Sequence, residues 1–246
     1  MQEVNMVLNL HGEVPSDPTT NTHVLNAEAT FLPHLVALHK RFPRLRIVLE
    51  HATPRAAVEC VKSLGDTVGC TITVHHLALV IDDWAGQSWN YCKPVAKTPD
   101  DREALREIIR EGQSLILYIV HGFTSIRPPQ ILFRFRLRSP SISFQIHVDA
   151  SSRMCCRYIL PPYSYRFAHV LESFGAVERL ADFTSNFGRK FYQRELTAAQ
   201  TNEEVVLKRN RKHIQQSWAV GDEKIVPFWA GQHLEWTIET TEEEIN

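Results

Sequence analysis

The stretch LRIVLEHAT at residues 45–53 contains the largely apolar run RIVL (46–49), which is followed by Glu50 and His51. A similar stretch, MVLNLHGE, precedes it at residues 6–13, and a third, CTITVHH, follows at residues 70–76. Short apolar runs rich in β-branched residues are typical of buried strands. The sequence therefore predicts three strands, each followed at its carboxyl end by histidine.

Helical patterns separate these three runs. Residues 28–41 carry apolar side chains at helical spacing, and Pro54 is well placed to begin a second helix. Residues 98–111 form the best-marked helix, with threonine as N-cap, proline at the first position and two aspartates in the first turn. Strands that alternate with helices indicate parallel pairing through helical crossovers, and 246 residues is close to the length of a complete α/β barrel.

Composition excludes several classes of protein. The formal net charge is −1, which gives no field that would attract nucleic acid or an anionic membrane. The five cysteines contain no CxxC pair, so a cysteine-built zinc or redox site is not expected. The cysteine pattern predicts a reducing, cytoplasmic location. No apolar run is long enough to cross a bilayer, and the first residues lack the features of a signal peptide.

The histidines that follow the strands suggest a metal site. All strands of a parallel α/β array point the same way, so His11, His51, His75 and His76 are expected together at the end of the barrel where the strands terminate. Neutral imidazole is a good zinc ligand. The alternative, that these histidines are structural, remains open on the pattern alone.

Beyond these patterns, the sequence resembles the dihydroorotases, in particular the class that contains the fungal and the shorter bacterial enzymes. The matching stretches are LNLHGEV (8–14), VLNAEATFLPHL (24–35), LRIVLEHAT (45–53), TITVHHL (71–77), DDWAGQ (82–87), YCKPVAKTPDDREAL (91–105), LESFGAVERLADF (171–183) and VPFWAGQHLEWTI (226–238). The resemblance implies a fold of the α/β class, a partial (β/α)₈ TIM barrel of the metal-dependent hydrolase type. It places an incomplete amidohydrolase domain at residues 1–239 and an acidic tail at residues 240–246.

The resemblance also implies a function and site residues. The family is a zinc-dependent hydrolase that interconverts L-dihydroorotate and N-carbamoyl-L-aspartate in pyrimidine biosynthesis. His11 and His51 would be metal ligands. His11 and Lys93 would contact the small-molecule substrate, Lys93 through its backbone. His76 would either hold a residue that contacts the metal or substrate, or have a structural role only.

Several parts of the family's active site are missing. The sequence contains no HxH motif, no lysine in the position that bridges two zinc ions and no family aspartate motif. The chain is therefore expected to be N-terminally truncated, to hold at most one partial zinc site of the family's two, and to lack catalytic residues and activity of its own. Open sheet edges predict a homodimer. The alternative is a non-enzymatic remnant that acts as a structural or interaction protein.

Residues 114–168 differ from the rest, with seven arginines, no lysine and Asp149 as the one acid. This composition fits three interpretations: a basic nucleic-acid-binding ribbon, an edge strand with a solvated arginine face, and a segment translated out of frame. The out-of-frame interpretation is favoured, because FTSIRPP at residues 123–129 can encode DSAP in another frame. We accordingly predict no nucleic-acid and no membrane partner. After this segment, a helix is expected over residues 196–216.

Overall fold

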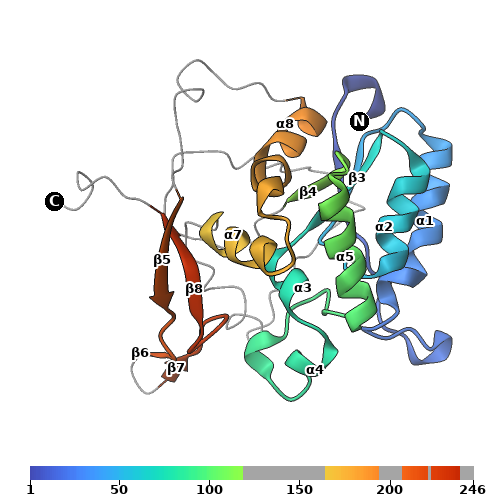
Figure 1. The fold of residues 1–246 in the computed structure, drawn as a ribbon. Helices are drawn as coiled ribbons and strands as arrows, with labels where there is room; N and C mark the ends of the chain where they lie inside the picture. The colour runs from blue at the N-terminus through green and yellow to red at the C-terminus, as the bar shows by residue number, and fades with distance from the viewer. Residues whose placement is uncertain (119–163, 194–206, 221–222, 239–246) are drawn as a thin grey trace.

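A computed structural model describes residues 1–118, 164–193, 207–220 and 223–238 (Figure 1). At its centre lies a sheet of four parallel strands in the order β1-β2-β3-β4. The strands are β1 (Leu8–His11), β2 (Ile47–Glu50), β3 (Val68–Ile72) and β4 (Ile116–Tyr118). Each strand pairs with the next one along the chain, which is the topology of a barrel built from βα units. The predicted partial (β/α)₈ barrel is confirmed.

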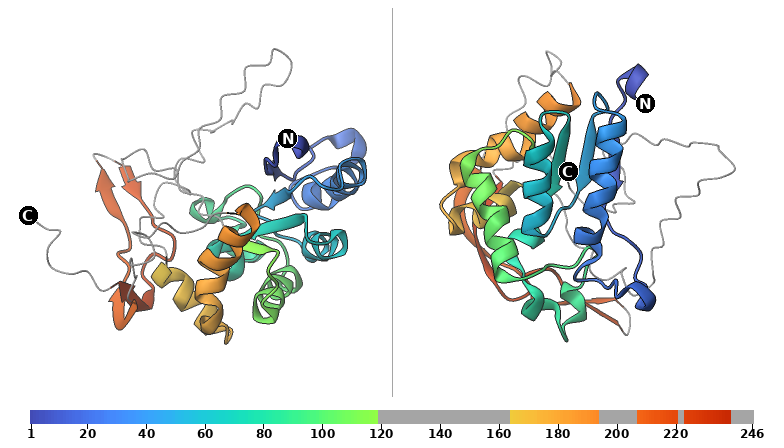
Figure 2. Two further views of the ribbon diagram at one scale, coloured as in Figure 1. Left: turned by 90° about the horizontal axis from the view of Figure 1, so that it is seen from above. Right: turned by 90° about the vertical axis from the view of Figure 1, so that its right-hand side faces the viewer.

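Three long helices connect these strands and lie side by side along the sheet (Figures 1 and 2). They are α1 (Ala27–Arg41), α2 (Arg55–Leu64) and α5 (Pro99–Glu111), close to the predicted ranges. Between helices and sheet is one apolar core, in which Ile47, Ile72 and Leu105 are almost completely buried. Burial of this kind is the main stabilising contribution to such a layer.

Helix α5 begins and ends as its sequence predicts. The Thr98 hydroxyl donates to Asp101 at 2.7 Å and accepts from the Asp101 backbone N–H at 3.3 Å, while Pro99 is the first helical residue. At the other end Gly112 has φ +69°, the left-handed conformation that glycine adopts without strain. This helix therefore holds the loop before it, which carries Lys97, at a fixed position.

The remaining elements lie outside this layer of three connecting helices. They are η1 (Gln2–Val4), η2 (Pro18–Thr20), α3 (Val74–Ala78), α4 (Ile81–Trp84), η3 (Ser88–Asn90), α7 (Ser164–Ser173), η4 (Val177–Arg179), η5 (Asp182–Asn186), α8 (Phe187–Tyr192), β5 (Leu207–His213), β6 (Trp218–Val220), β7 (Glu223–Ile225) and β8 (His233–Ile238). No helix in the described ranges is both long and apolar enough to cross a membrane.

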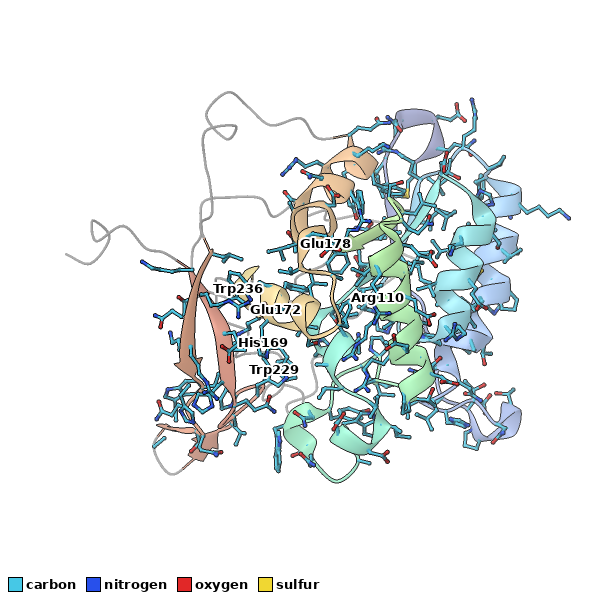
Figure 3. The ribbon with its side chains drawn as sticks, in the orientation of Figure 1. Arg110, His169, Glu172, Glu178, Trp229 and Trp236 are labelled. Carbon is cyan, nitrogen blue, oxygen red and sulfur yellow. The ribbon has the colours of Figure 1, made fainter. Side chains whose placement is uncertain are left out.

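The helix predicted over residues 196–216 is wrong for its described part, because β5 is a strand that pairs with β8 in antiparallel fashion. Arg209 lies over the ring of Trp236 at 5.1 Å and also pairs with Glu172 on α7. Trp236 donates its indole N–H to Glu172 at 2.9 Å (Figure 3). These contacts come from segments distant in sequence, and they outweigh the helical propensity of the basic run.

Only the two ends of the arginine-rich segment belong to the described residues. Strand β4 at one end pairs with β3, and helix α7 begins at the other, where Arg166 is buried. The frame prediction for its middle, Asp149 included, lies outside the described residues, as does the acidic tail at 240–246.

Candidate metal centre

Two histidines meet at the carboxyl ends of neighbouring strands. His11 is the last residue of β1 and His51 directly follows β2, with which β1 pairs in parallel. Nδ1 of His11 and Nε2 of His51 are 3.0 Å apart, and the rings meet edge to face at 71°. Two nitrogens bound to one tetrahedral zinc ion at about 2.0–2.1 Å would be about 3.3 Å apart. Small side-chain adjustments would therefore let both nitrogens face one ion.

Glu13 fixes the orientation of His11. Nε2 of His11 lies 2.8 Å from the Glu13 carboxylate, an acceptor, so this nitrogen carries the proton and Nδ1 keeps its lone pair. Burial tends to raise the pKa of Glu13, but the hydrogen bond with His11 and the nearby charges of His11, Lys93 and Lys97 together lower it. A carboxylate that holds the far nitrogen of a histidine is a common arrangement behind zinc ligands. Glu13 is not among the predicted site residues, although it lies in the same HGE motif as His11.

His51 is held by its backbone. Its φ is +44°, in the left-handed region that non-glycine residues rarely adopt, and its side chain is buried. The His51 N–H donates to the Thr71 hydroxyl at 2.6 Å, and the Ala52 N–H donates to the Thr71 carbonyl at 2.8 Å. Strand β3 thus holds the turn that directs the His51 ring toward His11.

The third predicted group, His75 and His76, takes another position. Strand β3 ends at Ile72, and both histidines lie in the helix α3, because Thr73 turns the chain out of the sheet before them. His76 donates through Nε2 to the Pro94 carbonyl at 2.9 Å, so its Nδ1 accepts from the Thr73 hydroxyl at 2.7 Å. Burial, more than the nearby His75, lowers the pKa of His76 well below its usual value.

Both ring nitrogens of His76 are thus engaged by protein atoms, and the residue ties α3 to the loop at Pro94. Histidines from three strand ends were expected to meet; those of two strand ends, His11 and His51, do so. Within the parts of the chain that the structure describes, no group of three or more histidine, cysteine or acidic side chains could hold a metal ion. The chemistry of the pair fits two of the three or four ligands of a zinc ion.

Lys93 lies beside this centre in the loop before α5. It is exposed and precedes the buried Pro94, and its charge helps to lower the pKa of Glu13. Glu50, which pairs with His11 in register, is also close, and burial raises its pKa while His11 opposes that rise. The centre therefore combines two imidazoles, two carboxyl groups and one amine.

A buried ion pair lies on the inner side of the same loop. The Lys97 ammonium is 2.7 Å from the Glu28 carboxylate, and each residue is about 5% exposed or less. Glu28 also accepts hydrogen bonds from the N–H and hydroxyl groups of Thr53. This pair cannot be predicted from the sequence, because no local pattern relates residues 69 positions apart.

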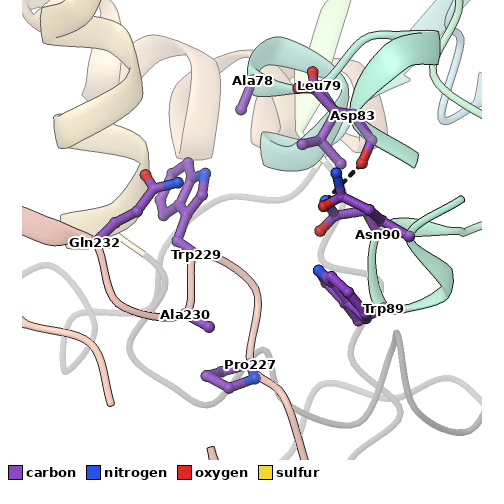
Figure 4. A pocket seen from close by; sticks show the side chains of 10 residues that line it. Ala78, Leu79, Asp83, Trp89, Asn90, Pro227, Trp229, Ala230 and Gln232 are labelled. Atoms are coloured by element: carbon purple, nitrogen blue, oxygen red, sulfur yellow. Dashed lines mark hydrogen bonds between the residues drawn. The ribbon is translucent and has the colours of Figure 1, made fainter. Parts of the chain in front are cut away.

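A pocket of about 360 Å³ opens elsewhere, between the α4–η3 segment and the chain before β8 (Figure 4). Its walls are mainly amides, indoles and one carboxylate, contributed by Ala78, Leu79, Asp83, Gln87, Trp89, Asn90, Pro227, Trp229, Ala230 and Gln232. None of the predicted site residues lines it, so the metal chemistry belongs to the strand ends.

A parallel α/β barrel segment with paired histidines at the strand ends is the arrangement expected of a metal-dependent hydrolase. No protein-family model matches the chain. The chain is 41% identical to the dihydroorotase of Mycosarcoma maydis and 36% identical to that of Saccharomyces cerevisiae, over 97% of its own length in both cases. The chain belongs to the dihydroorotase family, as the sequence motifs indicated.

A solved structure agrees with this assignment. The Saccharomyces cerevisiae dihydroorotase, crystallised with 5-fluoroorotic acid, superimposes with a TM-score of 0.74 at 33% identity over 97% of this chain. The chain spans 68% and 64% of the lengths of the two relatives and 64% of the crystallised protein. It thus corresponds to about two thirds of the proteins it matches.

Proposed function

We propose that the chain provides the second-zinc and substrate-contacting part of a dihydroorotase, an enzyme that interconverts L-dihydroorotate and N-carbamoyl-L-aspartate. The observation that carries the proposal is the close approach of His11 and His51 at adjacent strand ends in a chain of this family. Zinc bound there would act as a Lewis acid toward the ring amide carbonyl.

The side chains of this chain would act on the metal and the substrate by position and charge. His11 would offer the Nδ1 lone pair, because Glu13 holds its other nitrogen. Nε2 of His51 then donates the hydrogen bond to His11 Nδ1, and it would offer a lone pair to zinc once that proton has left. His11 is half exposed, so it can also contact substrate. Lys93, at the rim, presents its backbone and a positive charge to an anionic substrate. His76 keeps the loop of Lys93 against α3.

We further propose that the isolated chain does not catalyse the reaction. Two histidines are fewer than the ligands of an ordinary zinc site, and the HxH pair, bridging lysine and aspartate motif of the family are missing from the sequence. At most one of the family's two zinc ions would bind, and weakly. A small-molecule substrate, a cytoplasmic location and a homodimer remain predictions that accompany this function.

Metal titration tests the proposal directly. Isothermal titration of the purified chain with zinc should show weak binding that His11→Ala and His51→Ala each abolish. The matched control is His213→Ala, because His213 and His233 form a second pair with rings 4.9 Å apart on the exposed β5–β8 ribbon. Binding that survives the loss of His11 but not of His213 would refute the proposed centre.

An activity assay tests the second part. Wild-type chain with added zinc should hydrolyse dihydroorotate no faster than buffer with zinc. Hydrolysis above that background that disappears in the His51→Ala variant would show that the chain is itself an enzyme, and that the expectation of inactivity is wrong.

A further inference from the structure

Glu28 is a buried carboxylate that the proposed metal site does not use. It lies in the first turn of α1 and is 4% exposed. Its Oε2 contacts the Lys97 ammonium at 2.7 Å, and its Oε1 accepts the Thr53 N–H at 3.0 Å. Lys97 also donates to the Val95 carbonyl at 2.8 Å. A buried charge is costly unless it is paired and hydrogen-bonded, and both conditions are met here.

The residue that Glu28 holds is two positions after His51. Thr53 gives Glu28 both its N–H and its hydroxyl, so the chain directly after the histidine is fastened to α1. On the other side, the N–H groups of His51 and Ala52 are bound to Thr71 on β3. The left-handed His51 backbone, φ +44°, therefore lies between two anchors, and such a conformation persists only where its surroundings fix it.

We propose that Glu28 is a positioning residue for His51, and that Lys97 orients Glu28 for this task. The proposal deepens the metal centre above and rests on it. Glu28 acts through Thr53, since its carboxylate fixes the turn that points the His51 ring toward His11. Lys97 lies in the loop that also contains Lys93, so one buried pair sets both the metal-binding turn and the substrate-side loop.

Two double variants separate positioning from stability. Glu28→Met with Lys97→Met removes both charges and leaves the Thr53 N–H without its acceptor. Glu28→Gln with Lys97→Met removes the same charges but keeps an amide oxygen for that N–H. The amide group can also donate to the Thr53 hydroxyl. Both variants avoid an unpaired buried charge, so both should fold.

Zinc affinity provides the first readout. The Glu28→Met/Lys97→Met variant should bind zinc about 10- to 100-fold more weakly than wild type, as is usual when a group behind a ligand is lost. The Glu28→Gln/Lys97→Met variant should stay close to wild type. The control is Glu111→Met/Lys62→Met, which removes a half-exposed pair between α2 and α5 and should leave affinity unchanged. Equal affinity in the two Glu28 variants would overturn the proposal.

Amide hydrogen exchange of the metal-free protein provides the second readout. The N–H of Thr53, and with it that of Ala52, should exchange about tenfold faster in the Glu28→Met/Lys97→Met variant than in the Glu28→Gln/Lys97→Met variant. Equal exchange would overturn the positioning role. If wild type binds no zinc through His11, the proposed function fails, and the exchange comparison still decides the role of Glu28.

Discussion

Replacing Lys97 with methionine tests how much the buried ion pair contributes to folding. The substitution keeps most of the side-chain volume but leaves the Glu28 carboxylate without the ammonium 2.7 Å away. Burial raises the pKa of Glu28, and the Lys97 charge is the largest influence that opposes the rise. Without Lys97 the pKa of Glu28 should rise further, which favours the protonated carboxyl group in the folded variant.

Protonation limits the cost of the substitution. Protonating a glutamate whose unfolded pKa is about 4.3 costs about 1.36 kcal/mol for each pH unit above that pKa. At pH 7 this cost is about 3.7 kcal/mol. Breaking a buried pair usually costs about 3–5 kcal/mol, so a loss of about 3–4 kcal/mol in the free energy of unfolding is expected. Because the pKa of Glu28 is higher in the folded variant than in the unfolded chain, the loss of stability is absent below the unfolded pKa and grows as the pH rises. At pH 5.5 the loss should be about 1.6 kcal/mol.

Urea unfolding at pH 7 and pH 5.5, followed by circular dichroism, measures this difference. Lys62→Met is the matched control, because its partner Glu111 lies 2.8 Å away and both side chains are nearly half exposed. That control should lose less than about 1 kcal/mol at either pH. A loss in the Lys97 variant that is no larger than in the control, or that does not shrink at pH 5.5, would refute the reasoning.

Three further substitutions test other parts of the structure. Glu13→Gln should weaken zinc binding about 10- to 100-fold with little change in stability, because the His11 tautomer is no longer fixed; unchanged affinity in a zinc titration would contradict this. Phe167→Ala should cost about 3–5 kcal/mol in urea unfolding, since the ring is fully buried and lies 5.8 Å from that of Phe183. Gly112→Ala should lower the free energy of unfolding by about 1 kcal/mol, because φ at Gly112 is +69°. A variant more stable than wild type would contradict this left-handed conformation.

The parts of the fold that the sequence predicts are those with local causes. The apolar run before His51 predicts β2 to within one residue, and Thr98 predicts the start of α5, because strand burial and helix capping depend on a few neighbouring residues. The pairing of His11 with His51 also follows from local patterns, since parallel strands bring their ends together.

The parts that sequence reasoning missed depend on contacts between distant segments. Strand β5 was expected as helix, because its pairing with β8 and the stacking of Arg209 on Trp236 leave no local pattern. The Glu28–Lys97 pair was missed for the same reason. The placement of His76 in a helix depends on how the chain turns at Thr73, which strand propensity alone does not show.

The register between β1 and β2, rather than the residues between the two strands, determines where the two histidines lie. His11 and His51 are forty residues apart along the chain, yet they are neighbours because His11 pairs with Glu50, the residue before His51. Much of the intervening sequence in α1 and its loops can therefore diverge without moving the two imidazoles, provided that Glu13 and Glu28 keep their contacts. A one-residue slip of β1, in contrast, would turn His11 to the other face of the sheet. Selection for function should thus tolerate change in the helical layer and oppose insertions within the strands.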